Sequence, residues 1–295
     1  MIRTKTTCKR LVLYALGAIG YALGLPLFAR LRRRLGPGEF RILNYHSVSA
    51  RRLHETSTPP AEFEAQMAFL ARRARVLPLS DLVRGRAPGR EASLPAVAVT
   101  LDDGYADNLY EAMPILERHR LPATCFVAAG YPGTGRRLPH DAGLADEARV
   151  LTWEEVRELR RRGMEIGSHG MEHGRFSRLS DEQLRAEARD SKRRIEHELG
   201  EAIPVISFPF GRAGDQDERA IAEARAAGYE GAATAMYGWN RTGGDTFRLR
   251  RIGMEASDTL FTLRAKLNGA LDLLVLLESG PCRRVVRRLN RWWGG

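Results

Sequence analysis

Cysteine is scarce in this chain, with three residues, Cys8, Cys125 and Cys282, among 295. So few thiols exclude the disulfide framework on which small secreted domains rely. Cys125 lies in the apolar run 123–127 and is expected to be a small core residue. A chain of this length suits one large domain of about 200–250 residues plus appendages, and no internal repeat divides it.

Acidic residues are absent from both ends of the chain. Residues 1–34 carry eight Lys and Arg and no acid, and residues 283–295 carry five Arg and no acid. The formal net charge of +11 therefore resides at the ends, and the body between them is close to neutral. A basic protein can bind nucleic acid, but no groove-reading helix or RNP-like aromatic strand lies between the ends. Nucleic-acid binding is therefore not expected.

Only one long uncharged apolar run is present, the 19 residues from Leu11 to Ala29. This length just meets the requirement for a helix that crosses ~30 Å of hydrocarbon. We predict a single-pass membrane anchor over residues 1–34. The alternative is a cleavable signal peptide with a basic start, although no convincing small-x-small cleavage site is found. Four basic residues on each side nearly cancel under the positive-inside rule, so charge leaves the orientation open.

Acidic and imidazole side chains follow two predicted strands. The apolar run 94–101 predicts a buried strand, and Asp102 and Asp103 come directly after it. The run 164–168 predicts a second strand that ends at His169, with His173 four residues later. In α/β proteins the chemistry gathers where strands leave the core. Carboxylate and imidazole ligands suit Zn²⁺ or a similar ion, although an acidic turn and a chance pair of histidines would give the same pattern.

Four motifs extend this pattern. They are Leu43-Asn-Tyr-His46, Thr100-Leu-Asp-Asp-Gly104, Glu165-Ile-Gly-Ser-His-Gly-Met-Glu-His173 and Ser207-Phe-Pro-Phe-Gly211. In this order they resemble the polysaccharide deacetylases of carbohydrate esterase family four, over a stretch from about Ile42 to Met254. The resemblance implies an α/β fold, a distorted (β/α) barrel over residues 35–256, with its metal site at the carboxyl ends of the strands.

The resemblance also implies roles for individual residues. Asp103, His169 and His173 would hold a divalent ion, with Zn²⁺ expected first and Co²⁺, Ni²⁺ or Mn²⁺ as alternatives. Asp102 would be the general base that takes a proton from the attacking water. The backbone N–H of Phe210 would be the second donor to the oxyanion.

Two family features are missing and need substitutes. No histidine lies beyond His197 to serve as the acid for the leaving amine. His46 is the candidate, because some biofilm-polysaccharide deacetylases carry this motif near the N-terminus; the alternative is a histidine that merely caps a strand. The arginine that usually pairs with the base is also absent, and Arg251 is the candidate substitute, unless Arg250 and Arg251 are solvated charges. Gly170 replaces a common Ser or Thr, so one supporting hydroxyl is missing.

Substrate contacts are predicted from proximity to these motifs. The predicted sugar-binding residues are Tyr105, Phe208 and Pro209, together with the ring of Phe210. The Gly- and Pro-containing stretch from Gly130 to Arg149 is predicted to be a mobile loop over the site, in which Arg136, Arg137 and His140 would reach sugar unless the loop is simply solvated.

The C-terminal segment 257–295 is predicted to be a helical, basic, amphipathic tail. Its arginines and two tryptophans favour a membrane surface, and a solvated helix end is the alternative.

The expected protein is a metal-dependent hydrolase anchored in the inner membrane, with its catalytic domain facing outward. It would remove acetyl groups from N-acetylated amino sugars of an exopolysaccharide or of peptidoglycan, with envelope export machinery as a partner. The alternatives are an O-acetyl glycan esterase and a catalytically silent glycan-binding module.

Overall fold

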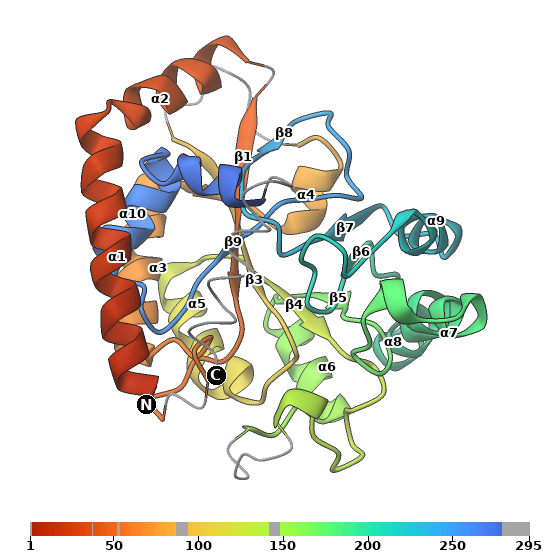
Figure 1. Cartoon of the computed structure of the whole chain (residues 1–295). Helices are drawn as coiled ribbons and strands as arrows, with labels where there is room; N and C mark the ends of the chain where they lie inside the picture. The colour runs from red at the N-terminus through yellow and green to blue at the C-terminus, as the bar shows by residue number, and fades with distance from the viewer. Residues whose placement is uncertain (1, 37, 52–53, 87–93, 142–147, 279–295) are drawn as a thin grey trace.

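The computed structural model describes residues 2–278 apart from residues 37, 52–53, 87–93 and 142–147, so the last part of the predicted basic tail lies outside the described residues. One curled sheet carries the named strands in the order β7-β6-β5-β4-β3-β1-β8, with β2 beside β3 and β9 beside β1 (Figure 1). The strands are β1 (Glu39–Tyr45), β2 (Arg75–Val76), β3 (Ala96–Leu101), β4 (Thr124–Val127), β5 (Glu165–Ser168), β6 (Val205–Ser207), β7 (Gly231–Ala233), β8 (Asn240–Arg241) and β9 (Ile252–Gly253).

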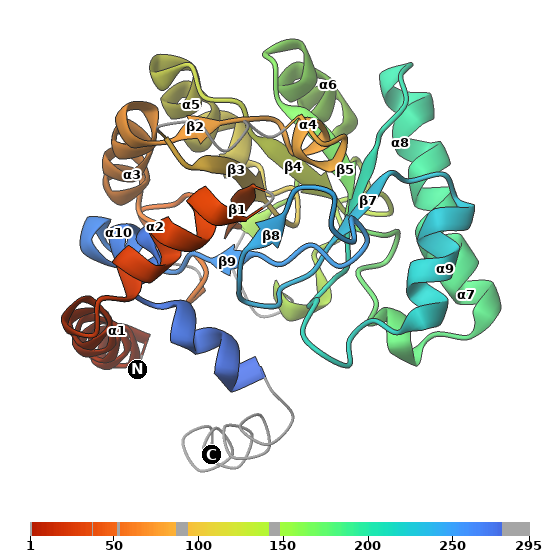
Figure 2. The same ribbon diagram turned by 90° about the horizontal axis from the view of Figure 1, so that it is seen from above.

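Helices surround the outer face of the sheet (Figure 2). The α-helices are α1 (Ile2–Ala22), α2 (Leu25–Leu35), α3 (Pro60–Arg73), α4 (Leu79–Val83), α5 (Met113–His119), α6 (Trp153–Arg161), α7 (Asp181–Arg185), α8 (Ser191–Leu199), α9 (Glu218–Ala226) and α10 (Leu260–Asn268). Short 3₁₀ turns are η2 (Pro139–Asp141), η4 (Phe176–Arg178) and η6 (Asp272–Glu278), and π turns are η1 (Asn108–Ala112) and η5 (Ala186–Asp190). The hydroxyls of Thr152 and Ser180 cap α6 and α7 by accepting the backbone N–H three residues on, as their sequences indicate.

In the described part of the chain, the segment 246–253 links the two edges of the sheet. Leu249 forms a single parallel bridge with Ala233 of β7, and Ile252 of β9 pairs with Leu43 of β1. Strands β6, β7 and β9 have only two or three residues each, too few to close a regular ladder of hydrogen bonds. The mixed α/β fold is confirmed, but the predicted distorted barrel is a curled half-barrel.

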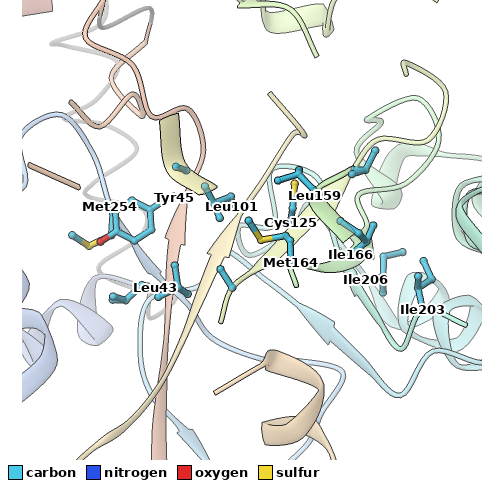
Figure 3. Close-up of a cluster of buried hydrophobic side chains, with 14 of the residues drawn as sticks. Leu43, Tyr45, Leu101, Cys125, Leu159, Met164, Ile166, Ile203, Ile206 and Met254 are labelled. Atoms are coloured by element: carbon cyan, nitrogen blue, oxygen red, sulfur yellow. The ribbon is translucent and has the colours of Figure 1, made fainter. Parts of the chain in front are cut away.

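Side chains along β3 alternate between two apolar clusters. Val97, Val99 and Leu101 join the cluster beneath the outer helices, to which Cys125 also belongs, as expected (Figure 3). Ala98 joins the cluster inside the curl, which α4 helps to fill. Because strand side chains repeat with a period of two, the next inward positions after Ala98 are residues 100 and 102.

The same alternation governs β1 and β6. Phe40 and Ile42 of β1 belong to the inner cluster, which makes residues 44 and 46 the next inward positions. Val205 of β6 is also in the inner cluster, so Ser207 follows on the same side. The apolar inner face of the curl therefore turns polar at the carboxyl ends of the strands, and this is where the motif residues lie.

The first helix lies along the body of the protein, next to α10 (Figure 1). Among the described residues, no single helix has both the length and the apolar character needed to cross a membrane; residues 6–22 of α1 pass such a test only together with α2, across a bend of 66°. The described part of the predicted C-terminal tail is packed, since α10 buries Leu263, Ala265 and Lys266.

Candidate active site

Asp102 and Asp103 occupy the turn that ends β3. Asp103 has a φ of 75°, in the left-handed region that non-glycine residues rarely adopt. Four described non-glycine residues have positive φ, and three of them, Asp103, His173 and Phe210, lie in this region. Strained backbone of this kind persists where the surrounding contacts hold it, and it clusters at functional sites. The turn directs the two neighbouring carboxylates to different partners.

Asp103, His169 and His173 converge as the sequence predicts. Oδ1 of Asp103 lies 3.1 Å from Nε2 of His173 and 3.4 Å from Nε2 of His169. One ligand atom from each residue lies within 4.8 Å of the others, and all three side chains are buried. One carboxylate and two imidazoles are a ligand set that could hold a divalent metal ion.

The surroundings of these three residues fit a cation. Nδ1 of His169 lies 2.8 Å from the carbonyl oxygen of Ser207. Because a carbonyl oxygen can only accept, Nδ1 carries the proton, and the lone pair is on Nε2, which faces Asp103. Burial raises the pKa of Asp103, but the imidazoles of His140, His169 and His173 outweigh burial and hold that pKa well below its ordinary value. Oδ1 of Asp103 is buried without a hydrogen-bond partner among the described residues. An ionised, unpaired oxygen of this kind is suited to bind a metal ion.

Arg251 lies in the segment that connects the two edges of the sheet, and its side chain is only 1 % exposed. Its guanidinium donates to both oxygens of Asp102, each over 2.7 Å. The remaining N–H groups donate to Asn44, Ser207 and Thr234 over 2.8–2.9 Å. Burial excludes the alternative of a solvated Arg251. In the family that the sequence resembles, an arginine elsewhere in the chain would make this contact with the base. The catalytic role of Arg251 stays a prediction.

The pair sets the charge of Asp102. Burial raises the pKa of Asp102, but the positive charge of Arg251, followed by the His169 imidazole, outweighs burial and brings the pKa below its ordinary value. Asp102 therefore remains an ionised carboxylate that can accept a proton. Its Oδ2 lies 3.9 Å from Nε2 of His169, directly beside the three predicted metal ligands.

His46 follows β1 and lines the same cleft as Asp102 and the metal set. Its Nδ1 is buried without a hydrogen-bond partner among the described residues. Asn108 donates to the His46 carbonyl over 2.8 Å, and Asp107 accepts from Ser47 and Val48 over 2.5 and 3.1 Å. These two residues hold the His46 loop and were not identified from the sequence, although they follow the acidic motif closely. The proton-donor role of His46 stays a prediction.

Phe210 is the exposed aromatic residue of the site, with 38 % of its surface accessible. Its ring lies 5.0 Å from that of His173, and the Arg175 guanidinium stacks over it at 3.8 Å. A φ of 61° turns its backbone, and its N–H makes no hydrogen bond within the described part of the chain. This N–H is therefore free to donate to an incoming carbonyl oxygen, which is the predicted role.

The predicted sugar contacts of Tyr105 and Phe208 need correction. Both side chains are 1 % exposed, and Pro209 is buried as well. Phe208 packs edge-on against Phe176, and Tyr105 donates its hydroxyl to Asp141. Proximity in sequence to a catalytic motif does not determine which side chain of a strand end points outward. Tyr105 does not line the cleft, whereas Phe208 belongs to the cleft lining but exposes little of its ring.

A buried carboxylate supports the loop of the metal histidines. Glu187 of η5 accepts the backbone N–H groups of Met171 and Glu172 over 2.5 and 3.0 Å. Gly170 has a φ of 77°, and a Cβ there would overlap the Glu187 carboxylate. Glu187 therefore accounts for the glycine at position 170, because its carboxylate occupies the space that a Ser or Thr side chain would need there. Glu187 had no short-range sequence signal, although π turns such as η5 often mark functional sites.

A second group of polar residues lies on the other side of Asp103. Nε2 of His140 is 3.6 Å from Oδ2 of Asp103 and 3.0 Å from the Tyr105 hydroxyl. Nδ1 of His54 is 3.5 Å from Asp141, which is fully buried. His140, predicted only as a sugar contact, thus lies against a predicted metal ligand, and His54 was missed because nothing near it in sequence marks it. Arg136 of the same loop instead forms an ion pair with Glu172.

The site opens into a cleft of about 570 Å³. Its lining combines the metal set and Asp102 with His46, Phe210 and Arg175. The predicted metal ligands, the predicted base and an exposed aromatic ring thus share one cavity at the carboxyl ends of the strands.

Comparison with known proteins agrees with this geometry. The family model for polysaccharide deacetylase matches residues 89–232. The chain is 28 % identical over 217 residues to the candidate polysaccharide deacetylase YxkH of Bacillus subtilis (strain 168), covering 73 % of this chain and 71 % of that protein. It is 22 % identical over 202 residues to the poly-beta-1,6-N-acetyl-D-glucosamine N-deacetylase of Staphylococcus aureus (strain MRSA252), covering 59 % and 65 %.

Solved structures share the fold. The deacetylase PplD of Streptococcus pyogenes superposes with a TM-score of 0.65 at 22 % identity, over 79 % of this chain and 99 % of that one. IcaB from Ammonifex degensii gives a TM-score of 0.61 at 20 % identity, over 79 % and 97 %. The chain is thus similar to polysaccharide deacetylases in sequence and in fold, and these relatives support a deacetylase hydrolase activity.

Proposed function

We propose that this protein is a polysaccharide deacetylase that removes acetyl groups from N-acetylated amino sugars of a polysaccharide, in a reaction that requires a divalent metal ion. The observation that carries the proposal is the pairing of Asp102 with Arg251 beside the buried set Asp103, His169 and His173, inside one cleft. A protein that only binds a glycan needs neither a general base nor an arginine that keeps the base ionised.

In the proposed reaction, Asp103, His169 and His173 hold the ion, with Zn²⁺ as the first choice. A divalent ion in such a site lowers the pKa of water and polarises a carbonyl group. Asp102 accepts one proton from the water whose oxygen bonds to the acetyl carbon. The N–H of Phe210 donates to the carbonyl oxygen as negative charge develops on it.

His46 completes the proton transfers. When the carbon–nitrogen bond breaks, the amine nitrogen needs a proton. Asp102 acts on the side of the attacking water, so a second group is proposed as the proton donor. A protonated His46 on the neighbouring strand end donates it, so that acetate and a free amino sugar leave. Asn108 and Asp107 act here as positioning residues, because they hold the His46 loop and do not line the cleft.

The substrate part of the proposal rests on the relatives and on the cleft. One relative is named as an N-deacetylase of poly-beta-1,6-N-acetyl-D-glucosamine. The cleft is open to solvent at Phe210, whose accessible ring offers a stacking face for a sugar. We therefore propose an N-acetylglucosamine polymer, with O-acetylated glycans as the competing substrate class.

The test is acetate release by the metal-stripped full chain, with and without added Zn²⁺ or Co²⁺. The substrates are an N-acetylglucosamine oligomer and an O-acetylated xylan. Metal-dependent acetate from the oligomer is the expected result. Release from xylan alone would replace the proposal by an esterase, and no release from either substrate with the metal bound would leave a binding module.

The role of His46 is tested by the choice of leaving group. His46→Ala is expected to slow hydrolysis of an amide more than that of an activated acetyl ester, since the alkoxide of an activated ester leaves without a proton. Asp107→Asn serves as a positioning variant, which is expected to lose less on the amide than His46→Ala. An equal loss of His46→Ala on both substrates would reject His46 as the general acid.

A further inference from the structure

Helix α1 is attached to the body along its length. Three of its polar side chains bond to residues between 256 and 268: Arg10 to the Ala256 and Ser257 carbonyls, Tyr14 to Thr259, and Tyr21 to Asn268. Gly20 lies so close to α10 that a Cβ there would overlap the Ala270 carbonyl. A helix held in this way cannot project from the body to cross a bilayer unless these contacts break.

The opposite face of α1 is apolar and exposed. Val12, Leu16, Ile19 and Leu23 recur at helical spacing along it, with Leu11 beside them. The intervening outward positions 15, 18 and 22 are all alanine. A continuous apolar face of this length is unusual on a soluble surface and marks a partner or a membrane.

The exposed apolar surface continues onto the neighbouring elements. On α2 the exposed large side chains are Leu27, Phe28, Leu31 and Leu35. Leu13 of α1 and Leu274 of η6 pack on the same small cluster, which places η6 beside α1, and η6 exposes Leu273 and Leu276.

The charge around this face identifies its occupant. Residues 1–34 contain eight basic residues and no acid. Arg30 and Arg34 of α2 are exposed at one end of the apolar face, and Lys9 of α1 is half-exposed at the other end, where it also pairs with Glu255. An amphipathic helix with an apolar face and cationic flanks is the signature of a helix that lies in the interface of an anionic membrane.

We propose that the outward face of α1, together with the joint to α2 and the leucines of η6, is embedded in the surface of an anionic lipid bilayer, so that α1 lies in the plane of the membrane and does not cross it. The polar contacts of α1 with residues 256–268 stay intact in this arrangement. It replaces the spanning anchor expected from the run 11–29, and it requires no change in the folded body.

The arrangement also places the cleft. Lys9, near the start of α1, forms an ion pair with Glu255, which lines the cleft. The catalytic opening therefore lies close to the membrane surface, where a polymer emerging from or attached to the membrane would reach Asp102. This consequence does not depend on which metal or which acetylated sugar the site accepts.

The first test is co-sedimentation of the full chain with phosphatidylcholine vesicles that contain or lack phosphatidylglycerol. We expect binding that rises with phosphatidylglycerol, and a loss of at least about 10-fold in the partition coefficient for Leu16→Glu/Ile19→Glu. The matched control is Arg185→Gln/Arg193→Gln, which changes the net charge equally on exposed positions of α7 and α8, on the opposite side of the molecule (Figure 1). The control should bind like the wild type.

The second test separates a helix in the plane from one across it. In a Cys282→Ser background, the exposed Cys8 reports one end of the segment. In a Cys8→Ser/Cys282→Ser background, Arg34→Cys reports the other end. The protein is bound to vesicles that have already formed, so that its body is outside. A membrane-impermeant maleimide is then added to the outer solution. Both thiols should react at similar rates.

Two results would overturn the proposal. Protection of one thiol but not of the other would mean that the segment crosses the bilayer. Unchanged vesicle binding of Leu16→Glu/Ile19→Glu, or a wild-type dimer in solution that this variant converts to monomers, would mean that the face contacts protein and not lipid. Acetate release from a short soluble oligomer should be the same for this variant and the wild type, so this test is independent of the proposed chemistry.

Discussion

Two buried arginines at opposite ends of the sheet bind an aspartate in the same way. Arg251 donates to both oxygens of Asp102 over 2.7 Å at the carboxyl ends of the strands. Arg41, near the start of β1, donates to both oxygens of Asp272 over 2.8 and 2.9 Å. The local geometry of the two pairs is nearly the same, so geometry alone does not identify the catalytic one.

The surroundings of the two pairs differ. Asp102 lies beside His169 and lines the cleft, whereas Asp272 accepts from Arg41 and Arg32 and ties η6 and α2 to β1. The carboxylate of a buried ion pair can act as a general base only where it can also reach the reacting water. The first pair is therefore interpreted as catalytic and the second as structural, and the two can be separated by matched substitutions.

The largest difference is expected between Asp102→Asn and Asp272→Asn. Asp102→Asn should lower kcat by about 10²–10⁴-fold while the metal content stays unchanged, because only the proton acceptor is lost. Asp272→Asn should keep kcat on a soluble oligomer and lower the stability of the fold. Acetate release together with metal analysis measures both. Full activity of Asp102→Asn would remove Asp102 as the base.

Removal of each arginine should lower stability to a different extent and should also differ in its effect on activity. Arg251→Met leaves the buried carboxylate of Asp102 without its guanidinium partner, which costs about 3–5 kcal/mol in the free energy of unfolding. Arg41→Met should cost less, because Asp272 is partly exposed and keeps its contact with Arg32. Only Arg251→Met should also lose activity in the folded fraction. Denaturant unfolding measures the first effect and acetate release the second; an active Arg251→Met would reject Arg251 as the substitute for the family arginine.

Removal of the Glu187 contacts that support the loop of His169 and His173 should have a smaller effect. Glu187→Ala removes the acceptor for two backbone N–H groups and is expected to lower metal affinity or activity by about 10–100-fold, as other outer contacts of metal ligands do. Gly170→Ala should have a comparable cost, because its Cβ overlaps Glu187. The double variant should lose less than the sum, since one change removes the overlap caused by the other. Additive losses, measured by metal titration, would mean that the two positions are independent.

The smallest expected effect is a shift in pH dependence. The pKa of Asp102 is lowered in the folded protein, so the stability from its pair with Arg251 is present above the ordinary pKa of 3.8 and is lost as pH falls through the lowered value. Arg251→Lys keeps the charge but not the two-pronged contact, so the pKa of Asp102 should rise. The acidic limb of the kcat/KM profile should then move up by about one pH unit. Arg41→Lys should leave that limb in place.

Local patterns predicted much of this site because they depend on neighbours in sequence. The run 96–101 is apolar and β-branched, so it forms a buried strand whatever surrounds it, and Asp102 and Asp103 must follow it at its exit. His169 follows β5 for the same reason. The capping boxes at Thr152 and Ser180 are likewise satisfied within one turn of helix.

Contacts between distant segments were less accessible to prediction. Arg251 could be named only as a candidate, because its contact with Asp102 joins residues 149 positions apart. Glu187 and His54 were missed, since no pattern near them records what they touch. The ring face predicted for Tyr105 was wrong, and Phe208 lines the cleft with little exposed surface, because burial depends on the packing of other segments over these rings.

The sequence by itself determined the α/β pattern, the family motifs, the predicted metal ligands and the basic, apolar N-terminal segment, because each depends on residue type and short-range spacing. Only the tertiary structure decided that the sheet is a curled half-barrel, that Arg251 reaches Asp102 while Arg41 serves the opposite end, and that α1 lies against α10. Those outcomes depend on which distant surfaces pack together, and the free energy of that packing is a property of the whole folded chain.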